Sequence, residues 1–290
     1  MLLGSQAGRT LDTITREVIN GGSNVQYGEG QVTGRHLLVG GEAAGNHYFT
    51  VRAVRKAVRF LKTMNAPRYE GSYWAIIHPD CSYDIQDDPD WKRPHEYKDT
   101  SNIYDDEIGK IAGVRFIETT EAKVFHADDL TEGARDLTVK SASSKVLTVN
   151  EAITTADAAK LAGREVVIGG ALLEIESATA AGAGSATITL KEAPAATPTA
   201  STTIYPGEAG AKGRNVYSTL IMGAEAYGTT ELTGGGLEHI VKPLGSAGTA
   251  DPLNQRATVG WKATKVAERL VEAYMIRVET TSTFDETPLT

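Results

Sequence analysis

The stretch Tyr48–Asn65 separates into two faces more cleanly than any other part of the chain, so it constrains the fold most. At about 100° per residue, one arc of a helix holds its apolar side chains. These are Val51, Val54, Ala57, Val58 and Leu61, followed by Asn65. The opposite arc is basic and holds Arg52, Arg55, Lys56, Arg59 and Lys62. No Gly or Pro interrupts the pattern before Pro67. The sequence therefore predicts a long amphipathic helix whose apolar stripe faces the core.

The basic stripe of this helix has two interpretations. It is either a solvated face, or a face that meets nucleic acid or the acidic surface of another subunit. The formal net charge of the whole chain is -8. Affinity for phosphate comes from Lys and Arg, so this charge argues against a protein whose main task is to coat DNA.

The overall composition is typical of a globular protein that folds in a reducing cytoplasm. Hydrophobic residues make up 41% and charged residues 23% of the chain. The single Cys81 excludes an internal disulfide framework and any multi-cysteine zinc site. No apolar run approaches the length of about 20 residues that spans a membrane, and the N-terminus predicts no signal peptide. We therefore expect no membrane partner.

The N-terminal part predicts elements with little core of their own. Thr10–Asn20 is expected to be a short helix with Thr10 as its cap, because Leu11, Ile14 and Val18 share one face. Residues 24–46 contain recurrent glycines at positions 28, 30, 34, 40, 41 and 45. Such punctuation favours an extended hairpin or loop over a packed element.

The segment after the amphipathic helix alternates short strands and helices, which indicates a compact α+β domain. Tyr73–Ile77 is an apolar run of strand length, and Cys81–Ile85 is expected to be helical. Residues 87–94 are acidic and broken by proline, which predicts a loop. The remaining elements are a short helix at Glu107–Ala112 and a strand at Val114–Thr119.

The composition shifts near Thr131. From Ala127 to Ile204 there is no aromatic residue, and Ala, Thr, Ser and Gly dominate. Turn signals separate short β-prone pieces, and one weak helical pattern lies at Ile153–Leu161. These features predict a small inserted β-rich domain, with a disordered linker as the alternative. The predicted strands are Leu137–Lys140, Lys145–Val149, Glu165–Ile168, Ala171–Ile175 and Ala186–Leu190.

The C-terminal part predicts strands that rejoin the first domain. Val216–Tyr227 is apolar again, and Arg256–Thr281 carries two long segments. In the second of these, Tyr274, Ile276 and Val278 alternate with polar residues. We expect long paired strands here to lie along the Tyr48–Asn65 helix and to cover its apolar stripe.

The chain offers no constellation of residues for catalysis. The closest is a cluster of His78, Asp80, Cys81 and Asp84, which we interpret as a structural turn because its members are only local neighbours. The acidic groups lack the spacing of a calcium-binding loop, so we interpret them as solvated loops. They are Asp87, Asp88 and Asp90, and Asp105, Asp106 and Glu107. We expect no enzyme activity, no cofactor and no metal.

Three long segments carry a family resemblance, and they occur in the right order. They are YWAIIHPDCSYD (Tyr73–Asp84), EIGKIAGVRFIETT (Glu107–Thr120) and DPLNQRATVGWKATKVAERLVEAYMIRVE (Asp251–Glu279). Together with the N-terminal LLGSQAGRTLDTITREVINGGSNVQY they resemble the major capsid proteins of tailed bacteriophages of the N4-like group. The resemblance covers most of the chain except about 131–206.

The resemblance implies an α+β protein of the Hong Kong 97-type capsid fold. On that plan the inserted β-rich domain interrupts the axial domain. The implied parts are an N-terminal arm (1–27), an extended loop (28–47), a spine helix of the peripheral domain (48–66), a first axial part (67–130), the insert (131–206), a second axial part (207–240), and peripheral-domain strands with the C-terminus (241–290).

The resemblance also implies a structural function. The chain is expected to self-assemble, through pentamers and hexamers, into the icosahedral capsid of a tailed phage. That shell encloses double-stranded DNA without sequence-specific binding and is assembled in the host cytoplasm. Scaffold, portal and decoration proteins are the expected partners, and intersubunit or inner-surface contacts are expected at Arg52, Arg55, Arg59 and Lys62. The alternatives are a decoration or host-surface-binding protein that uses the insert, and an enzyme that uses the His78–Asp84 cluster.

Overall fold

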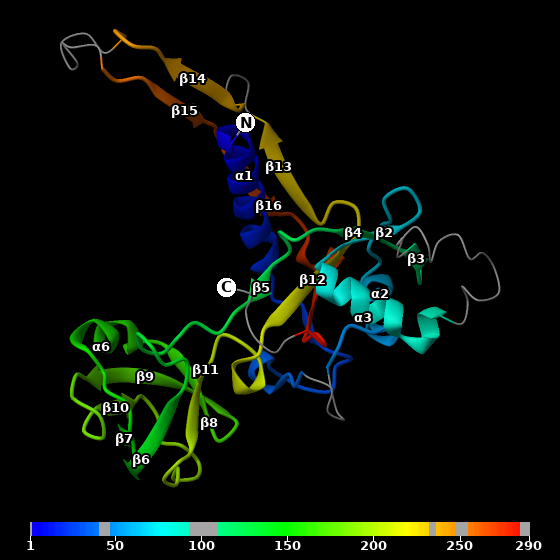
Figure 1. Ribbon diagram of the computed structural model, residues 1–290. Helices are drawn as coiled ribbons and strands as arrows, with labels where there is room; N and C mark the ends of the chain where they lie inside the picture. Colours follow the sequence, from blue (N-terminus) through cyan, green and yellow to red (C-terminus); the bar gives the residue numbers. More distant parts are fainter. Residues whose placement is uncertain (1, 41–46, 93–108, 232–235, 247–254, 285–290) are drawn as a thin grey trace.

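The computed structural model describes residues 2–40, 47–92, 109–231, 236–246 and 255–284. Within these ranges the chain is an α+β protein. It consists of a seven-stranded sheet, a closed β-barrel and two consecutive two-stranded pairs that project from the sheet (Figure 1). None of the described helices is long and apolar enough to span a membrane.

The seven-stranded sheet is built from strands that are far apart in the sequence. Its order is β1-β17-β12-β2-β4-β3, and β5 pairs with β12. The longest contact joins β12 and β17, which are antiparallel from Tyr217↔Thr280 to Met222↔Met275. Every residue of β12 is buried, including Ser218 and Thr219, as expected for the central strand of a sheet that is covered on both faces. The bounds are β1 Val25–Tyr27, β2 Tyr73–Ile77, β3 Lys110–Ile111, β4 Val114–Glu118, β5 Val124–Phe125, β12 Val216–Met222 and β17 Met275–Thr280.

The predicted amphipathic helix is confirmed as α2 (Val51–Thr63), which is 13 residues long. Its apolar stripe is buried in one core together with residues of β2, β12 and β17. Helix α3 (Pro79–Asp87) adds Cys81 and Ile85 to the same core. The prediction that C-terminal strands cover the α2 stripe is right for β17 only, through Ile276 and Val278.

The N-terminal helix is longer than the sequence predicts. Helix α1 spans Leu2–Asn20, 19 residues. Thr10 is therefore not a cap; its hydroxyl donates to the Gln6 carbonyl at 2.8 Å inside the helix. The physical reason is that an apolar stripe continues upstream, where Ala7 is fully buried.

Helix α1 packs against a projecting two-part hairpin that we call the ribbon. In the ribbon, β13 (Tyr227–Glu231) pairs with β16 (Lys265–Arg269), and β14 (Glu238–Lys242) pairs with β15 (Thr258–Lys262). Figure 1 shows the ribbon extending beyond the sheet with α1 beside it. In the described residues the first C-terminal segment therefore packs mainly against α1, which corrects the expectation that it covers the stripe of the Tyr48–Asn65 helix.

The predicted β-rich insert forms a closed barrel, so the linker alternative is wrong. The barrel order is β10-β7-β6-β11-β8-β9. Its core is separate from that of the sheet and includes Leu137, Leu147, Ile175 and Ile188. Helix α6 (Thr155–Leu161) closes one side and begins with a capping box of Thr154 and Asp157. The strands are β6 Leu137–Ser143, β7 Val146–Val149, β8 Glu165–Ile168, β9 Ala171–Thr179, β10 Thr187–Leu190 and β11 Thr203–Pro206.

Two predicted elements, the helix at 107–112 and the loop at 87–94, differ from the structure because of local turns and side-chain caps. The described part of the expected Glu107–Ala112 helix contains strand β3, because Ala112 and Gly113 both take positive φ (52° and 87°) in a tight turn to β4. The expected loop 87–94 is helical at residues 89–92, where the Asp88 side chain accepts a hydrogen bond from the Asp90 N–H at 2.8 Å. Residues 93, 94, 107 and 108 lie outside the described ranges.

The glycine-punctuated segment 28–47 is folded back onto the sheet in its described part. Leu38 is fully buried, and its carbonyl accepts from the Ala211 N–H at 2.8 Å. The short 3-10 helices η1 (Arg35–Leu37) and η2 (Ala211–Gly213) contact each other here. The expected extended loop 28–47 also includes residues 41–46, which lie outside the described ranges.

Candidate functional site

The exposed side of α2 presents five cations, Arg52, Arg55, Lys56, Arg59 and Lys62, which we call the α2 basic face. The helix is fixed at its start by two side chains. The Thr50 hydroxyl accepts from the Ala53 N–H at 3.1 Å, and an Asp88 oxygen accepts from the Val51 N–H at 2.9 Å. Because the apolar stripe is buried, the cations on the opposite side of the helix face outward.

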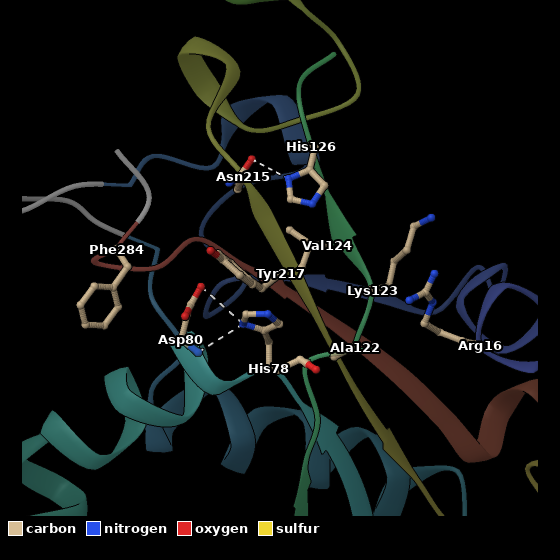
Figure 2. A pocket seen from close by; sticks show the side chains of 11 residues that line it. Arg16, His78, Asp80, Ala122, Lys123, Val124, His126, Asn215, Tyr217 and Phe284 are labelled. Carbon is tan, nitrogen blue, oxygen red and sulfur yellow. Dashed lines mark hydrogen bonds and ion pairs between the residues drawn. The ribbon is translucent and has the colours of Figure 1, made fainter. Parts of the chain in front are cut away.

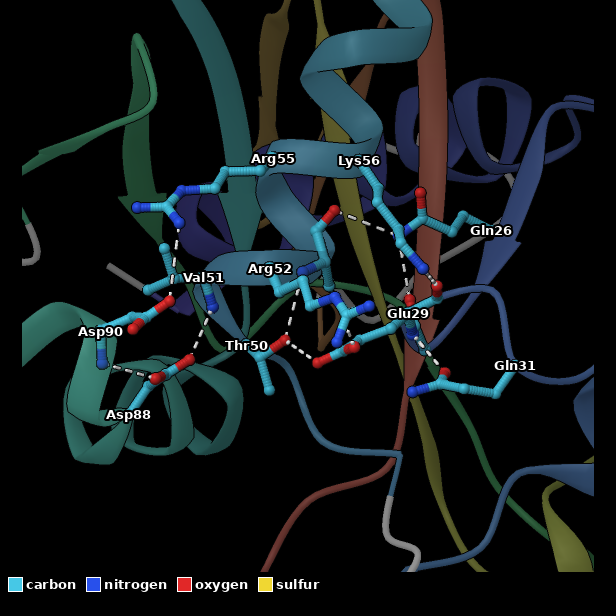
Figure 3. Close-up of polar contacts among 12 residues, drawn as sticks. Gln26, Glu29, Gln31, Thr50, Val51, Arg52, Arg55, Lys56, Asp88 and Asp90 are labelled. Atoms are coloured by element: carbon cyan, nitrogen blue, oxygen red, sulfur yellow. Dashed lines mark hydrogen bonds and ion pairs between the residues drawn. The ribbon is translucent and has the colours of Figure 1, made fainter.

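The N-terminal half of the α2 basic face is neutralised within the chain. The Arg52 Nε lies 3.4 Å from a Glu29 carboxylate oxygen, and Arg55 lies 3.5 Å from an Asp90 oxygen. Glu29 also accepts a hydrogen bond from the Thr50 hydroxyl at 2.9 Å, and Lys56 donates to the Glu29 carbonyl. Figure 3 shows these acids arranged around the first turns of the helix.

The C-terminal half of this face differs. Neither the Arg59 nor the Lys62 side chain has a hydrogen bond or an ion pair with any described residue. Lys62 stands in the last turn, where a cation interacts favourably with the helix dipole. The four predicted contact residues are thus two paired cations, Arg52 and Arg55, and two, Arg59 and Lys62, without a partner among the described residues.

The local cluster after β2 is structural in its geometry. His78 caps α3, because its Nδ1 accepts from the Asp80 N–H at 3.2 Å. The Cys81 thiol is fully buried 3.6 Å from the Thr280 hydroxyl, and burial raises its pKa. Asp84 accepts from the Thr283 hydroxyl at 2.6 Å. His78 Nδ1 also lies 3.4 Å from an Asp80 carboxylate oxygen, whereas the Cys81 thiol and Asp84 have partners outside the cluster, so the described contacts do not join the thiol to a base.

A cavity of about 500 Å³ lies beside this cluster, between α3, β5 and β12. In Figure 2 His78, Tyr217 and His126 line it, with Arg16 and Lys123 on the side away from Phe284. The His78 and Tyr217 rings are 4.9 Å apart, and burial lowers the pKa of His78. Arg16 and Lys123 share the single negative charge of the Glu17 carboxylate, and Asp80 on the cavity wall supplies a second one. The cavity therefore lacks a surplus of either charge.

The acidic residues predicted to lie in solvated loops make contacts within the chain where the structure describes them. Asp88 accepts a hydrogen bond from the first residue of α2, Asp90 pairs with Arg55, and Asp87 contacts Lys92. Residues 105–107 lie outside the described ranges. Among the described residues, no group of three or more His, Cys, Asp or Glu side chains could hold a metal ion.

The ribbon is a second candidate surface, which sequence reasoning missed. Of the sixteen exposed large hydrophobic side chains in the described residues, seven lie between Tyr227 and Leu270. A groove of about 590 Å³ between the ribbon and the start of α1 is lined by Leu3, Ala7, Leu237, Val259 and Trp261, among others. The alternation in LEHIV (237–241) and TVGWK (258–262) was the signal that could have identified it.

Comparison with protein families identifies the class. The family model described as phage capsid protein matches residues 2–229, most of the chain. The chain belongs to this family and is a phage capsid protein. A search of curated proteins gave no match.

Solved structures similar to this chain include three phage capsids. The capsid of cyanophage P-SCSP1u is 12% identical, with 95% of this chain and 62% of that chain covered and a TM-score of 0.47. The capsid of Ralstonia phage GP4 is 11% identical, with 91% and 54% covered and a TM-score of 0.44. The acidic stable capsid of Helicobacter pylori bacteriophage KHP30 is 9% identical, with 95% and 67% covered and a TM-score of 0.46.

At TM-scores below 0.5 these likenesses do not by themselves establish a shared fold. The chain also spans only 54% to 67% of the length of these capsid chains.

Proposed function

We propose that the chain is the shell-forming subunit of an icosahedral capsid that encloses the double-stranded DNA of a tailed phage. Family membership supports a capsid role, and the exposed apolar ribbon carries the proposal that copies of the chain associate. A two-stranded ribbon has marginal stability in water, and exposed apolar side chains gain free energy when a neighbour covers them. Many such contacts reinforce one another when a closed shell forms.

The Hong Kong 97-type plan and the relation to the N4-like group are part of this proposal. The division into arm (1–27), extended loop (28–47), spine helix (48–66), axial and peripheral parts is proposed as the sequence predicted it. Helix α2 is the proposed spine, and its apolar stripe packs with residues of β12 and β17. Helix α1 lies in the proposed arm and packs against β16 and β15.

The α2 basic face is proposed as a surface for intersubunit or inner-surface contacts through Arg52, Arg55, Arg59 and Lys62. Positive charge on the inner surface of the capsid is compatible with DNA that is held without sequence recognition. Scaffold, portal and decoration proteins are the proposed further partners. The proposed location is the virion capsid, after assembly in the host cytoplasm, with no membrane partner.

The test of self-association removes the apolar character of the ribbon. Val241 and Val259 lie opposite each other in the β14–β15 pair and are 54% and 48% exposed. The double variant Val241→Ser and Val259→Ser is compared with wild type by sedimentation velocity over a range of protein concentrations. The proposal predicts fewer large assemblies in the variant.

The matched control is Val146→Ser with Leu172→Ser, two barrel residues that are 40% and 38% exposed. This control is expected to assemble as wild type does. Wild-type protein that stays monomeric at every concentration, with scaffold protein added, would refute the proposed function. In that case a decoration or host-surface role for the barrel becomes the better account.

A further inference from the structure

The α2 basic face carries an excess of positive charge at one end only. Arg59 and Lys62 are three residues apart, so they share one side of the helix. Both are exposed, and the described part of the chain supplies neither with a hydrogen bond or an ion pair. Their neighbours Arg52 and Arg55 are paired with Glu29 and Asp90. The free end therefore fits an acidic partner, and the paired end provides an internal comparison.

Acidic side chains with the same lack of partners occur elsewhere on the chain. Asp128, Asp129 and Glu132 are exposed, and their carboxylates have no hydrogen bond or ion pair within the described ranges. Their backbone is held in place, because Arg164 donates to the carbonyls of Asp128 and Asp129 at 2.6 and 2.7 Å. We call these three exposed acidic residues the neck acids; the backbone of the first two is anchored by Arg164.

The α2 helix and the neck acids are on opposite flanks of the molecule. The neck acids belong to the segment between β5 and β6, where the chain enters the barrel, and Figure 1 shows the barrel on the side away from α2. One chain therefore cannot bring the two surfaces together. A second copy can, and the contact is heterologous, because different surfaces of the two copies meet. Contacts of this type close into rings when the rotation between copies allows it.

We propose that Arg59 and Lys62 of one copy dock against Asp128, Asp129 and Glu132 of the next copy. The inference rests on the proposed function, since it names the partner surface for the α2 basic face. The observation that favours a second copy is charge complementarity between two exposed surfaces of the same chain, both without internal partners. Exposed pairs of this kind are individually weak and sensitive to salt, so they set orientation and register more than total affinity.

The test is a charge swap in the full chain. In the variant R59E with K62E, acidic side chains on α2 would face the neck acids and repel them. We expect the protein concentration at which half of the chains are assembled, measured by sedimentation velocity, to be about tenfold higher than for wild type. The variant D128K with D129K presents base to base and is expected to show the same defect. The combined variant carries all four changes, so the contact re-forms with reversed charge and assembly returns toward wild type.

Two controls keep the result interpretable. The pair R59Q with K62Q is compared with R52Q with R55Q, and the inference predicts the larger assembly defect for the first pair. Circular dichroism and thermal unfolding of every variant check that the monomer is folded. If a charge-swap variant is not folded, the assembly of the two Gln variants is compared at low and at high salt instead. Equal assembly defects in R59Q with K62Q and in R52Q with R55Q would overturn the inference.

The other outcomes are also decisive. If the combined variant assembles no better than R59E with K62E, the neck acids are not the partner, and a loss of retained DNA would point to nucleic acid instead. If wild type assembles and R59E with K62E assembles equally well, the inference fails while the proposed function stands. If wild type does not assemble at all, the proposed function fails and the inference falls with it.

Discussion

The Arg35 guanidinium contacts both carboxylate oxygens of Glu279, at 2.7 Å from Nε and 2.8 Å from a terminal nitrogen. Glu279 lies in β17 and is fully buried, and the Arg277 Nε lies 2.7 Å from the same carboxylate. Arg35 also stacks over the Phe125 ring, 3.4 Å from its centroid. This buried contact ties the glycine-punctuated segment to the central sheet, which explains why that segment is folded back.

Replacing Glu279 with Gln is expected to destabilise the fold strongly. The change leaves Arg35 and Arg277 without a counter-charge in a buried place, and breaking such a pair from one side costs about 3–5 kcal/mol. Urea unfolding followed by circular dichroism measures the loss. The control is Glu238→Gln, which breaks the exposed contact with Lys262 and should change stability by less than about 1 kcal/mol. Equal effects of the two changes would contradict this account of the segment.

The pH dependence of stability is expected to involve His78. Burial is the main cause that lowers its pKa below the ordinary 6.5, with His126 acting in the same direction and Asp80 and Glu118 opposing. The unfolded chain therefore binds a proton more readily than the folded chain just below pH 6.5, and stability falls as pH decreases through that window.

The variant His78→Asn tests this assignment, because the Asn side-chain oxygen can still accept from the Asp80 N–H. We expect similar stability at pH 8 and a smaller decrease between pH 7 and pH 5 than in wild type. Thermal unfolding across that range gives the comparison. His36 and His47, whose pKa values burial also lowers, are present in both proteins, so their contribution cancels. Parallel pH profiles would show that His78 does not titrate in this way.

The Cys81 thiol is expected to be unreactive in the folded protein. It is fully buried, and burial raises its pKa, so little thiolate forms near neutral pH. An aromatic disulfide reagent should react with it slowly in buffer and rapidly in concentrated guanidinium chloride. Fast reaction in buffer would mean that α3 opens readily and exposes the thiol.

The barrel is expected to fold without the rest of the chain. Its core does not merge with that of the sheet, and Arg164 links the two ends of the unit through Asp128, Asp129 and Glu208. A fragment of residues 128–208 should show β-type circular dichroism and a cooperative thermal transition. The fragment Thr154→Ala, which removes the helix cap, should be about 1 kcal/mol less stable. A fragment without a cooperative transition would show that the barrel depends on the sheet.

Local periodicity predicted several elements of the fold. Hydrophobic spacing alone predicts the α2 stripe, strand β2 and the barrel strands, because the spacing of buried residues within one element shows whatever partner covers them. Sequence reasoning failed where long-range pairing decides the structure. Nothing in Lys265–Arg269 specifies that β16 packs on α1, while the equally β-prone Met275–Thr280 enters the sheet.

The candidate site shows the same limit. Periodicity places Arg52, Arg55, Arg59 and Lys62 on one outward face, and this is where the structure has them. It could not separate paired from free cations, because Glu29 and Asp90 approach α2 from two other parts of the chain. Gly113 is a turn signal in the sequence, but Ala112 is not a residue that favours positive φ, so the β3–β4 hairpin did not follow from turn chemistry.

The central claim is that copies of this chain build a closed shell, and electron microscopy of the purified protein tests it most directly. The sample is examined by negative stain after size-exclusion chromatography with light scattering, with and without scaffold protein. The account predicts closed shells, or pentamers and hexamers that convert to shells. Protein that is monomeric under every condition would contradict it.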